Sequence, residues 1–193
     1  MHKKPYLIPA ALLSAVVLSA ILGWMIADRA AILRDGREVV LITEPIDPRD
    51  MLRGRYVRLN YKISDLPSDF FTHEQGKALG PGAPVFVRLR KAPSGRWFAF
   101  RVAVEPPASW YEEDGDVWIR GTARYGLDLS PRTIRVDYGI ERFYVPEPDA
   151  PQIEKRMRGG MLTDIVVAVG NGGRAQIRAL RQGTDTIYTE RLF

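Results

Sequence analysis

The chain has 193 residues, with 28 Lys and Arg against 23 Asp and Glu, two His and no Cys. This composition excludes disulfide frameworks, thiol nucleophiles and Cys-ligated metals, and two His residues cannot build a multi-His metal site. Outside the first 27 residues the net charge is only +3, and bases and acids are interspersed, so the basic balance does not indicate a nucleic-acid-binding protein.

The first predicted element is a transmembrane helix over residues 7–27. Its 21 residues carry no charge and, at about 1.5 Å per residue, span about 31 Å, the thickness of the hydrocarbon core of a bilayer. Tyr6 and Trp24 lie near its ends, where interfacial aromatic residues belong. A cleaved signal peptide is the alternative, but its apolar region would be only about 7–15 residues long, so we expect a retained signal anchor.

Two short segments flank this helix. Residues 1–6 form a tail, and residues 28–36 form a linker or helix extension that Asp35 and Gly36 can end. Lys and Arg residues are nearly evenly divided between the two ends, so the positive-inside rule gives little preference. We expect a short cytoplasmic tail and a C-terminal domain on the other side of the membrane.

Small residues recur at every fourth position of the predicted membrane helix. They are Ala11, Ala15, Ser19, Gly23 and Ala27. Such a stripe forms a groove that another membrane helix can approach closely, which predicts a helix-packing face. Ala, Ser and Gly are common throughout this segment, so a chance alignment is the alternative interpretation.

Residues 37–193 are predicted to form one β-rich domain, because apolar and polar residues alternate along most of it. The alternation predicts strands over residues 37–43, 55–63, 84–90, 96–104, 117–125, 133–138, 163–169, 174–180 and 184–191. In one of them Phe98, Phe100, Val102 and Val104 are expected to share a face. Short helices are expected over residues 67–79 and 151–158. The predicted fold is mainly β, with a single N-terminal transmembrane helix followed by an antiparallel sandwich or barrel-like domain.

The segment between the first two strands is a loop punctuated by Pro and Asp. Asp47 and Asp50 can each accept hydrogen bonds from nearby backbone N–H groups, and Gly54 permits an unusual backbone angle before the next strand. In that strand Leu59 and Tyr61 share one face and are expected in the core, whereas Tyr56 points to the other face. Four arginines gather here and are expected to pair with nearby acids or to face solvent, with lipid head groups or an acidic partner as the alternative: Arg49, Arg53, Arg55 and Arg58.

The stretch GRYVRLNY over residues 54–61 resembles the signature of the GDYXXLXY protein family, which consists of membrane-anchored bacterial proteins. Gly54, Tyr56, Leu59 and Tyr61 match that signature, and Arg55 stands where the family has Asp. Residues 47–50 and a downstream region are also similar to the family, with these further candidate residues: Arg49, Tyr138, Gly139, Glu141, Tyr144 and Glu154. The resemblance implies an extracytoplasmic domain in the bacterial inner membrane that works beside a polytopic membrane protein, and it implies no known reaction.

Three catalytic or metal-binding interpretations are weaker. The acids Asp47, Asp50, Glu141, Glu147 and Glu154 could form an acid/base set, but nothing in their spacing fixes the separation of about 5–10 Å that glycoside hydrolysis needs. Asp47 and Asp50 together with Asp114 and Asp116 could suggest a divalent-ion site, but Asp114 and Asp116 lack the full spacing of an EF-hand loop. A signal-peptidase-like hydrolase would need a Ser activated by a Lys, but no Ser occurs between Ser19 and Ser64.

The sequence therefore predicts a non-catalytic, membrane-anchored extracytoplasmic domain without cofactor or metal. Its expected partner is a polytopic membrane protein or an envelope component, and not a nucleic acid. The alternative is a domain that binds a small ligand in a pocket lined by Tyr56, Tyr138, Tyr144 and loop acids. A hydrolase that uses Ser64 or Ser68 is the remote alternative.

Overall fold

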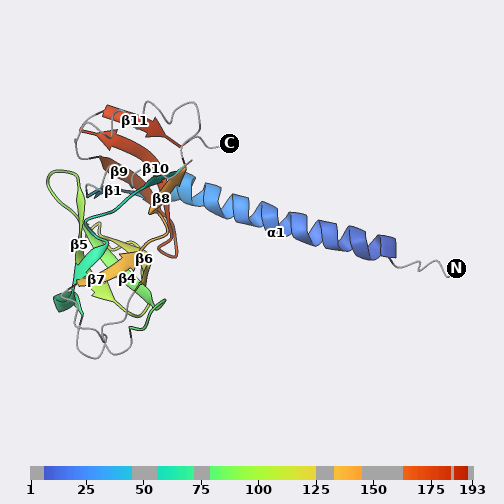
Figure 1. Cartoon of the computed structure of the whole chain (residues 1–193), viewed down its shortest axis with the longest axis horizontal. Coiled ribbons are helices and arrows are strands. Elements are labelled where there is room, and N and C mark those ends of the chain that lie inside the picture. The colour runs from blue at the N-terminus through green and yellow to red at the C-terminus, as the bar shows by residue number, and fades with distance from the viewer. Residues whose placement is uncertain are drawn as a thin grey trace.

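One long helix leads into a β-rich body in the computed structural model, which describes residues 7–44, 56–71, 79–124, 133–144, 163–183 and 185–190. The helix, α1 (Leu7–Asp35), projects away from the strands (Figure 1). It is long and apolar enough to cross a membrane, a property that an N-terminal signal sequence shares, and its most apolar part is not buried by the rest of the chain. Helix α1 ends where the Gly36 N–H donates a hydrogen bond of 2.9 Å to the Ile32 carbonyl.

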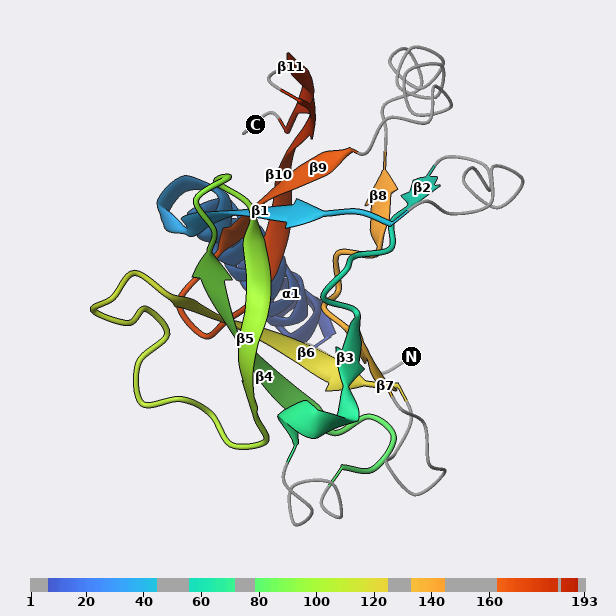
Figure 2. The same ribbon diagram turned by 90° about the vertical axis from the view of Figure 1, so that its left-hand side faces the viewer.

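Three antiparallel sheets follow α1 (Figure 2). The first has the order β1-β9-β10-β11, with β1 (Arg37–Ile42), β9 (Asp164–Val169), β10 (Ala175–Gln182) and β11 (Asp185–Thr189). The second has the order β3-β7-β6-β4-β5, with β3 (Asp65–Pro67), β7 (Thr133–Asp137), β6 (Val117–Ala123), β4 (Pro84–Lys91) and β5 (Trp97–Ala103). The third is a ribbon of β2 (Tyr56–Arg58) and β8 (Arg142–Tyr144).

All three sheets contribute to one hydrophobic core. It includes Leu41 of β1, Ile165 of β9, Val87 of β4, Ile119 of β6 and Phe143 of β8. Every residue of β9 is buried; the strand lies between β1 and β10 in its sheet, and Ile165, Val167 and Val169 face the core. The mainly β, sandwich or barrel-like architecture predicted from the alternation is confirmed, with antiparallel sheets curled around this core.

The strand predicted over residues 55–63 is shorter than expected. In the described residues it pairs as β2 over Tyr56–Arg58, and Tyr61 then forms an isolated bridge with Thr43. The Leu59 N–H donates to the Glu141 carbonyl, which continues the β2–β8 register by one position, and the next pairing of this segment is the bridge of Tyr61 to Thr43. The prediction of one continuous strand here is wrong.

A β-bulge corrects the predicted face of β5. Arg88 pairs with Arg101 and the next residue, Leu89, pairs with Ala99, so Phe100 is an extra residue in β5. An inserted residue reverses the alternation of a strand, which is why Trp97 and Val102 are both buried while Phe98 and Phe100 are 45% and 43% exposed. The expectation that Phe98, Phe100 and Val102 share a face is therefore wrong.

Helical structure after α1 is a single short turn in the described residues. The 3-10 helix η1 (Ser68–Phe70) occupies the start of the helix predicted over residues 67–79. Residues 72–78 and the helix predicted over residues 151–158 lie outside the described residues.

Candidate functional site

The two segments that carry the candidate residues lie side by side. Strands β2 and β8 pair antiparallel, so that Tyr56 is opposite Tyr144 and Arg58 is opposite Arg142. After β2, the Leu59 N–H donates to the Glu141 carbonyl at 2.8 Å. The fold thus joins residues 56–61 to residues 138–144 through their backbones.

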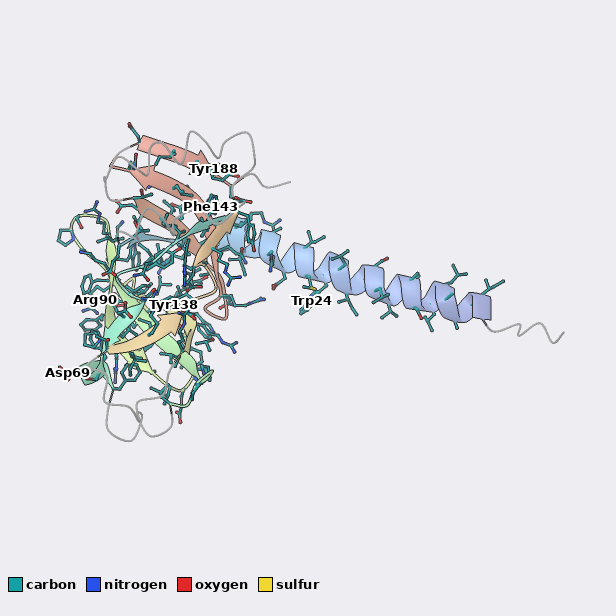
Figure 3. All side chains as sticks on the ribbon, in the orientation of Figure 1. Trp24, Asp69, Arg90, Tyr138, Phe143 and Tyr188 are labelled. Atoms are coloured by element: carbon teal, nitrogen blue, oxygen red, sulfur yellow. The ribbon has the colours of Figure 1, made fainter. Side chains whose placement is uncertain are left out.

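Tyr61 and Tyr138 bind the two segments together with reciprocal hydrogen bonds. The Tyr61 hydroxyl donates to the Ile140 carbonyl, and the Tyr138 hydroxyl donates to the Ile63 carbonyl, both at 2.6 Å. Tyr61 is fully buried and Tyr138 is 6% exposed (Figure 3). Burial raises the pKa of both hydroxyls well above the usual value, since the phenolate would lose its hydration, and the nearby Glu141 carboxylate adds to the effect. Both rings therefore act as neutral hydrogen-bond donors inside the core.

Gly139 and Glu141 shape the turn between the two tyrosine partners. Gly139 has φ of 79°, a conformation that favours glycine. The Glu141 carboxylate accepts a hydrogen bond of 2.5 Å from the Tyr138 N–H, which closes the turn. Glu141 is thus held by the backbone of its own turn. The other acids of the predicted acid/base set lie outside the described residues: Asp47, Asp50, Glu147 and Glu154.

A polar network that the sequence did not reveal lies next to this turn. Arg135 of β7 donates to Asp65 of β3 at 2.6 Å and also to the amide oxygen of Asn60. The Asn60 amide in turn donates to Glu44 at 3.0 Å. Asn60 and Asp65 are close in the sequence, but Glu44 and Arg135 are distant from them, so only the folded chain brings all four together.

The other predicted site residues are spread over different parts of the chain. Tyr144 is 65% exposed, and Leu59 is buried in the core. Tyr56 lies in β2, where the structure describes its backbone alone. Several candidates lie outside the described residues: Asp47, Arg49, Asp50, Gly54 and Glu154. The small residues of the predicted packing face all lie in α1 and are exposed: Ala11, Ala15, Ser19, Gly23 and Ala27.

The polar residues considered for catalysis or metal binding have structural partners or are buried. Asp116 is buried, and it accepts hydrogen bonds from Arg88 and Arg90 at 2.8 and 2.7 Å. Burial alone would raise its pKa, but the hydrogen bonds from Arg90 and Arg88 outweigh burial and lower the pKa. Ser64 is fully buried, and its hydroxyl has no hydrogen-bond partner among the described residues. Within the same residues, no group of three or more acidic or His side chains could hold a metal ion.

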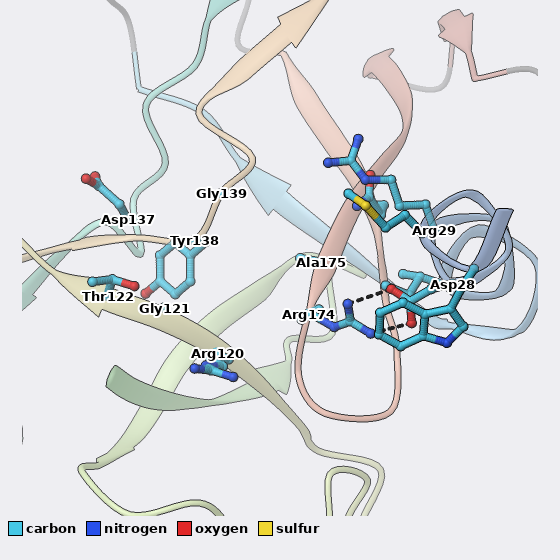
Figure 4. A pocket seen from close by; sticks show the side chains of 14 residues that line it. Asp28, Arg29, Arg120, Gly121, Thr122, Asp137, Tyr138, Gly139, Arg174 and Ala175 are labelled. Carbon is cyan, nitrogen blue, oxygen red and sulfur yellow. Dashed lines mark hydrogen bonds and ion pairs between the residues drawn. The ribbon is translucent and has the colours of Figure 1, made fainter. Parts of the chain in front are cut away.

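The last turns of α1 are clamped to the hairpin between β9 and β10. Asp28 forms a two-pronged ion pair with Arg174, with both nitrogen–oxygen distances at 2.5 Å (Figure 4). Ile32 is 5% exposed, and a Cβ added to Gly170 would lie 2.7 Å from its Cγ1 atom. A two-pronged pair of this kind fixes the orientation of both side chains, because each guanidinium nitrogen faces one carboxylate oxygen. We call the contacts of Asp28, Ile32, Gly170 and Arg174 the junction.

A cleft of about 660 Å³ lies beside the junction. One wall is α1, from Trp24 to Ile32, and the opposite wall is β6 together with the end of β7. Tyr138 and Gly139 line the second wall, so the cleft borders the segment that carries the downstream candidate residues. A second cleft of about 550 Å³ adjoins it and is lined by residues 139–144. We call the first of these the juxtamembrane cleft.

The clefts share two residues with the ligand pocket that the sequence predicted. Tyr138 lines the first cleft and Tyr144 lines the second, whereas the Tyr56 side chain lies outside the described residues. Both clefts lie between residues 137–144 and the end of α1. The helix extension predicted over residues 28–36 is the feature of the sequence that relates to these clefts, because residues of this extension form the wall on the side of α1.

Comparison with known proteins identifies a family. A family model described as GDYXXLXY protein matches residues 18–180, which include most of α1 and both paired segments. No curated protein and no solved structure matches the chain.

Proposed function

The chain belongs to the GDYXXLXY protein family, and from this membership and the junction we propose that it is a non-catalytic module of the bacterial inner membrane. In this proposal α1 anchors the chain, and the β-rich domain lies on the extracytoplasmic side. The domain and the helix together bind a polytopic membrane protein.

The junction is the observation that carries the proposal. A flexible linker would be sufficient to keep a domain near a membrane. In this chain α1 instead runs past its apolar part, contacts the β9–β10 hairpin through Asp28 and Ile32, and continues after Gly36 directly into β1. An exposed ion pair contributes little stability, so the buried Ile32 is the main contact. A fixed angle between helix and domain favours one partner that contacts both.

The surface of α1 supports a partner within the membrane. Its apolar side chains are exposed along the whole span, and a Cβ added to Gly23 would have open space around it. A stripe of small residues lets two helix backbones approach closely, which is a main source of helix association in lipid. We therefore place the helix contact on Ala15 and Gly23 and their neighbours in the stripe.

Copurification in a mild detergent tests this proposal. We expect the wild-type chain to retain a polytopic membrane protein and Ala15→Leu/Gly23→Leu to lose it, because the larger side chains separate the helices. Ala10→Leu is the matched control, since at 3.6 residues per turn position 10 lies on the opposite side of α1 from the centre of the stripe. Recovery of a lone chain, or equal retention by all three proteins, would contradict the proposal.

A second candidate function is the binding of an envelope component without a protein partner. The clefts beside α1 are the observation that favours it, because Tyr138 and Tyr144 each line one of them. In this case the Leu substitutions in α1 would leave function unchanged, and substitutions in the cleft walls would remove it.

A further inference from the structure

We propose that the juxtamembrane cleft binds the phosphate-bearing head group of an anionic phospholipid. This inference rests on α1 crossing the membrane, as in the proposed function, but it does not depend on a protein partner. It assigns a ligand class to a cleft whose walls come from α1, β6, the end of β7 and the β9–β10 hairpin.

The position of the cleft along α1 is the first argument. Trp24 and Met25 line it and belong to the apolar part of the helix, whereas Asp28 and Arg29 follow directly. At about 1.5 Å per residue, Trp24 and Arg29 are about 7.5 Å apart along the helix axis, close to the depth of the head-group region on one side of a bilayer. Trp24 is also 70% exposed, as interfacial Trp residues are when they contact lipid. The cleft therefore lies at the level of the head groups.

The charges in the cleft leave two arginines without a partner. Of its two acids, Asp28 pairs with Arg174 and Asp137 pairs with Arg124. Arg29 on α1 and Arg120 on β6 form no side-chain hydrogen bond or ion pair among the described residues, and both are exposed. They come from opposite walls and point in different directions in Figure 4, but both side chains are exposed and can turn toward a phosphate that binds between the walls.

The shape and polarity of the cleft match one lipid head group. Gly121, Gly139 and Ala175 line it with little or no side chain, which leaves about 660 Å³ of open space. Trp24 and Met25 offer apolar contacts at the membrane end, where the acyl chains of a lipid begin. Apolar and cationic groups thus follow each other along α1 in the same order as acyl chains and phosphate in a phospholipid.

The adjoining cleft lacks this charge pattern and serves as an internal comparison. It shares Arg29 and Asp137 with the first, and Arg124, Arg142, Glu141 and Glu190 also line it, so that three acidic side chains balance its three arginines. In the first cleft three arginines face two acidic side chains, so we assign the lipid to the cleft between Arg29 and Arg120.

Fluorescence quenching of Trp24 in vesicles tests the inference on the full chain. The protein is reconstituted in phosphatidylcholine vesicles that contain a minor amount of either brominated phosphatidylglycerol or brominated phosphatidylcholine. Bromine quenches a Trp that it contacts. Of the four Trp residues, Trp97 and Trp118 are buried in the domain, Trp110 is half-buried beside Gly173, and Trp24 is exposed on α1. We expect stronger quenching by the phosphatidylglycerol, which gives a relative association constant for the anionic lipid.

Removal of the two unpaired arginines supplies the decisive comparison. In Arg29→Gln/Arg120→Gln we expect the relative association constant to fall by about tenfold or more, because each charge-assisted hydrogen bond to phosphate is strong. Lys91→Gln/Arg101→Gln removes the same charge from exposed positions on β4 and β5, outside the cleft, and should keep the preference. An unchanged preference in the first variant, or an equal loss in the second, overturns the inference.

Two further measurements distinguish lipid binding from the binding of free phosphate and of a protein partner. Titration of inorganic phosphate into the full chain in a neutral detergent should give no saturable binding. If phosphate does bind, the binding depends on Arg29 and Arg120, and the vesicles show no lipid preference, the cleft is a free-phosphate site and the inference is overturned. Copurification of the polytopic partner by Arg29→Gln/Arg120→Gln reports on the proposed function separately. Retention of the partner together with loss of lipid preference would support both proposals.

Discussion

Tyrosine occupies positions 61 and 138 although both side chains lie in the core, where an apolar ring would fill the same space. Each hydroxyl donates a hydrogen bond to a backbone carbonyl of the other tyrosine's segment. These carbonyls, of Ile63 and Ile140, lie in turns and face the core and not a neighbouring strand. A buried carbonyl without a donor is costly. Backbone hydrogen bonding therefore explains why tyrosine stands at position 61 of the signature and at position 138 of the downstream segment.

Tyr61→Phe should lower the free energy of unfolding by about 1–3 kcal/mol, since it leaves the Ile140 carbonyl buried and unsatisfied. Thermal unfolding of the full chain in a mild detergent measures the change. Tyr111→Phe is the control, because its hydroxyl also donates to a carbonyl, that of Val169, but the residue is only half-buried and water can replace the bond. Equal losses in the two variants would contradict this account.

The same pair of tyrosines makes stability depend on alkaline pH. Burial raises the folded-state pKa of both hydroxyls, so they stay protonated in the folded chain while those in the unfolded chain ionise near pH 10. Their contribution is therefore complete below about pH 10 and is lost as the pH rises above that value. Melting temperatures measured from about pH 9 to about pH 11 should fall, and Tyr61→Phe/Tyr138→Phe should flatten the dependence. An equally steep fall in this variant would assign the effect to other groups.

Among the elements, the strands with clear alternation were predictable and the irregular ones were not. β4, β6, β9 and β10 follow the expected ranges within a few residues, because each has a buried face and a strong pattern. β3 and β8 have three residues each, too few to show a period of two. The bulge at Phe100 depends on pairing with β4, so no local pattern reveals it.

The candidate site was predictable only where it follows the motif. The resemblance brought residues 56–61 and 138–144 to attention, and the structure joins them through β2 and β8. The junction and the juxtamembrane cleft had no such signal, because the Asp28–Arg174 pair links residues 146 positions apart. Contacts at that separation depend on how α1 meets the β9–β10 hairpin, which the spacing of residues does not encode.

Gly36 lies at the boundary between α1 and β1, and a small substitution at this position should loosen the junction. A Cβ at this position would overlap the Ile32 carbonyl and lie 3.0 Å from the Val169 carbonyl, and neither backbone atom can move freely. In Gly36→Ala we expect trypsin to cleave after Arg34 and Arg37 at least about fivefold faster, because overpacking of this size opens the contact. Limited proteolysis of the full chain in detergent measures the rate.

Gly23→Ala is the matched control for this experiment. A Cβ at Gly23 meets nothing within 4 Å, so the same substitution in α1 should leave the cleavage rate unchanged. Equal rates in wild-type, Gly36→Ala and Gly23→Ala proteins would show that the close approach at Gly36 does not hold the junction.

The whole molecule resembles a cap on a stalk, with the domain spread around the axis of α1 (Figure 2). With α1 in a membrane, as we propose, one side of the domain faces the membrane and the strands on the other side face away from it. The chain contains no Cys, so a single introduced Cys reports its location without background. In Arg101→Cys we expect a membrane-impermeant maleimide to label intact spheroplasts, because the proposed orientation exports the domain. Labelling only after lysis would place the domain in the cytoplasm.

The pairing of β1 has a consequence for the order in which the domain folds. β1 follows the anchor directly, yet its only sheet partner among the described strands is β9, and Arg37 pairs with Val169 near the end of the chain. Nascent chains emerge with their N-terminal end first, so the edge of β1 stays unpaired until the β9–β10 hairpin is available. In the proposed export of the domain, this order keeps the domain unfolded during its passage through a translocation channel until β9 and β10 have arrived. Chains truncated before residue 164 should therefore be substrates for envelope proteases, although they keep an intact anchor.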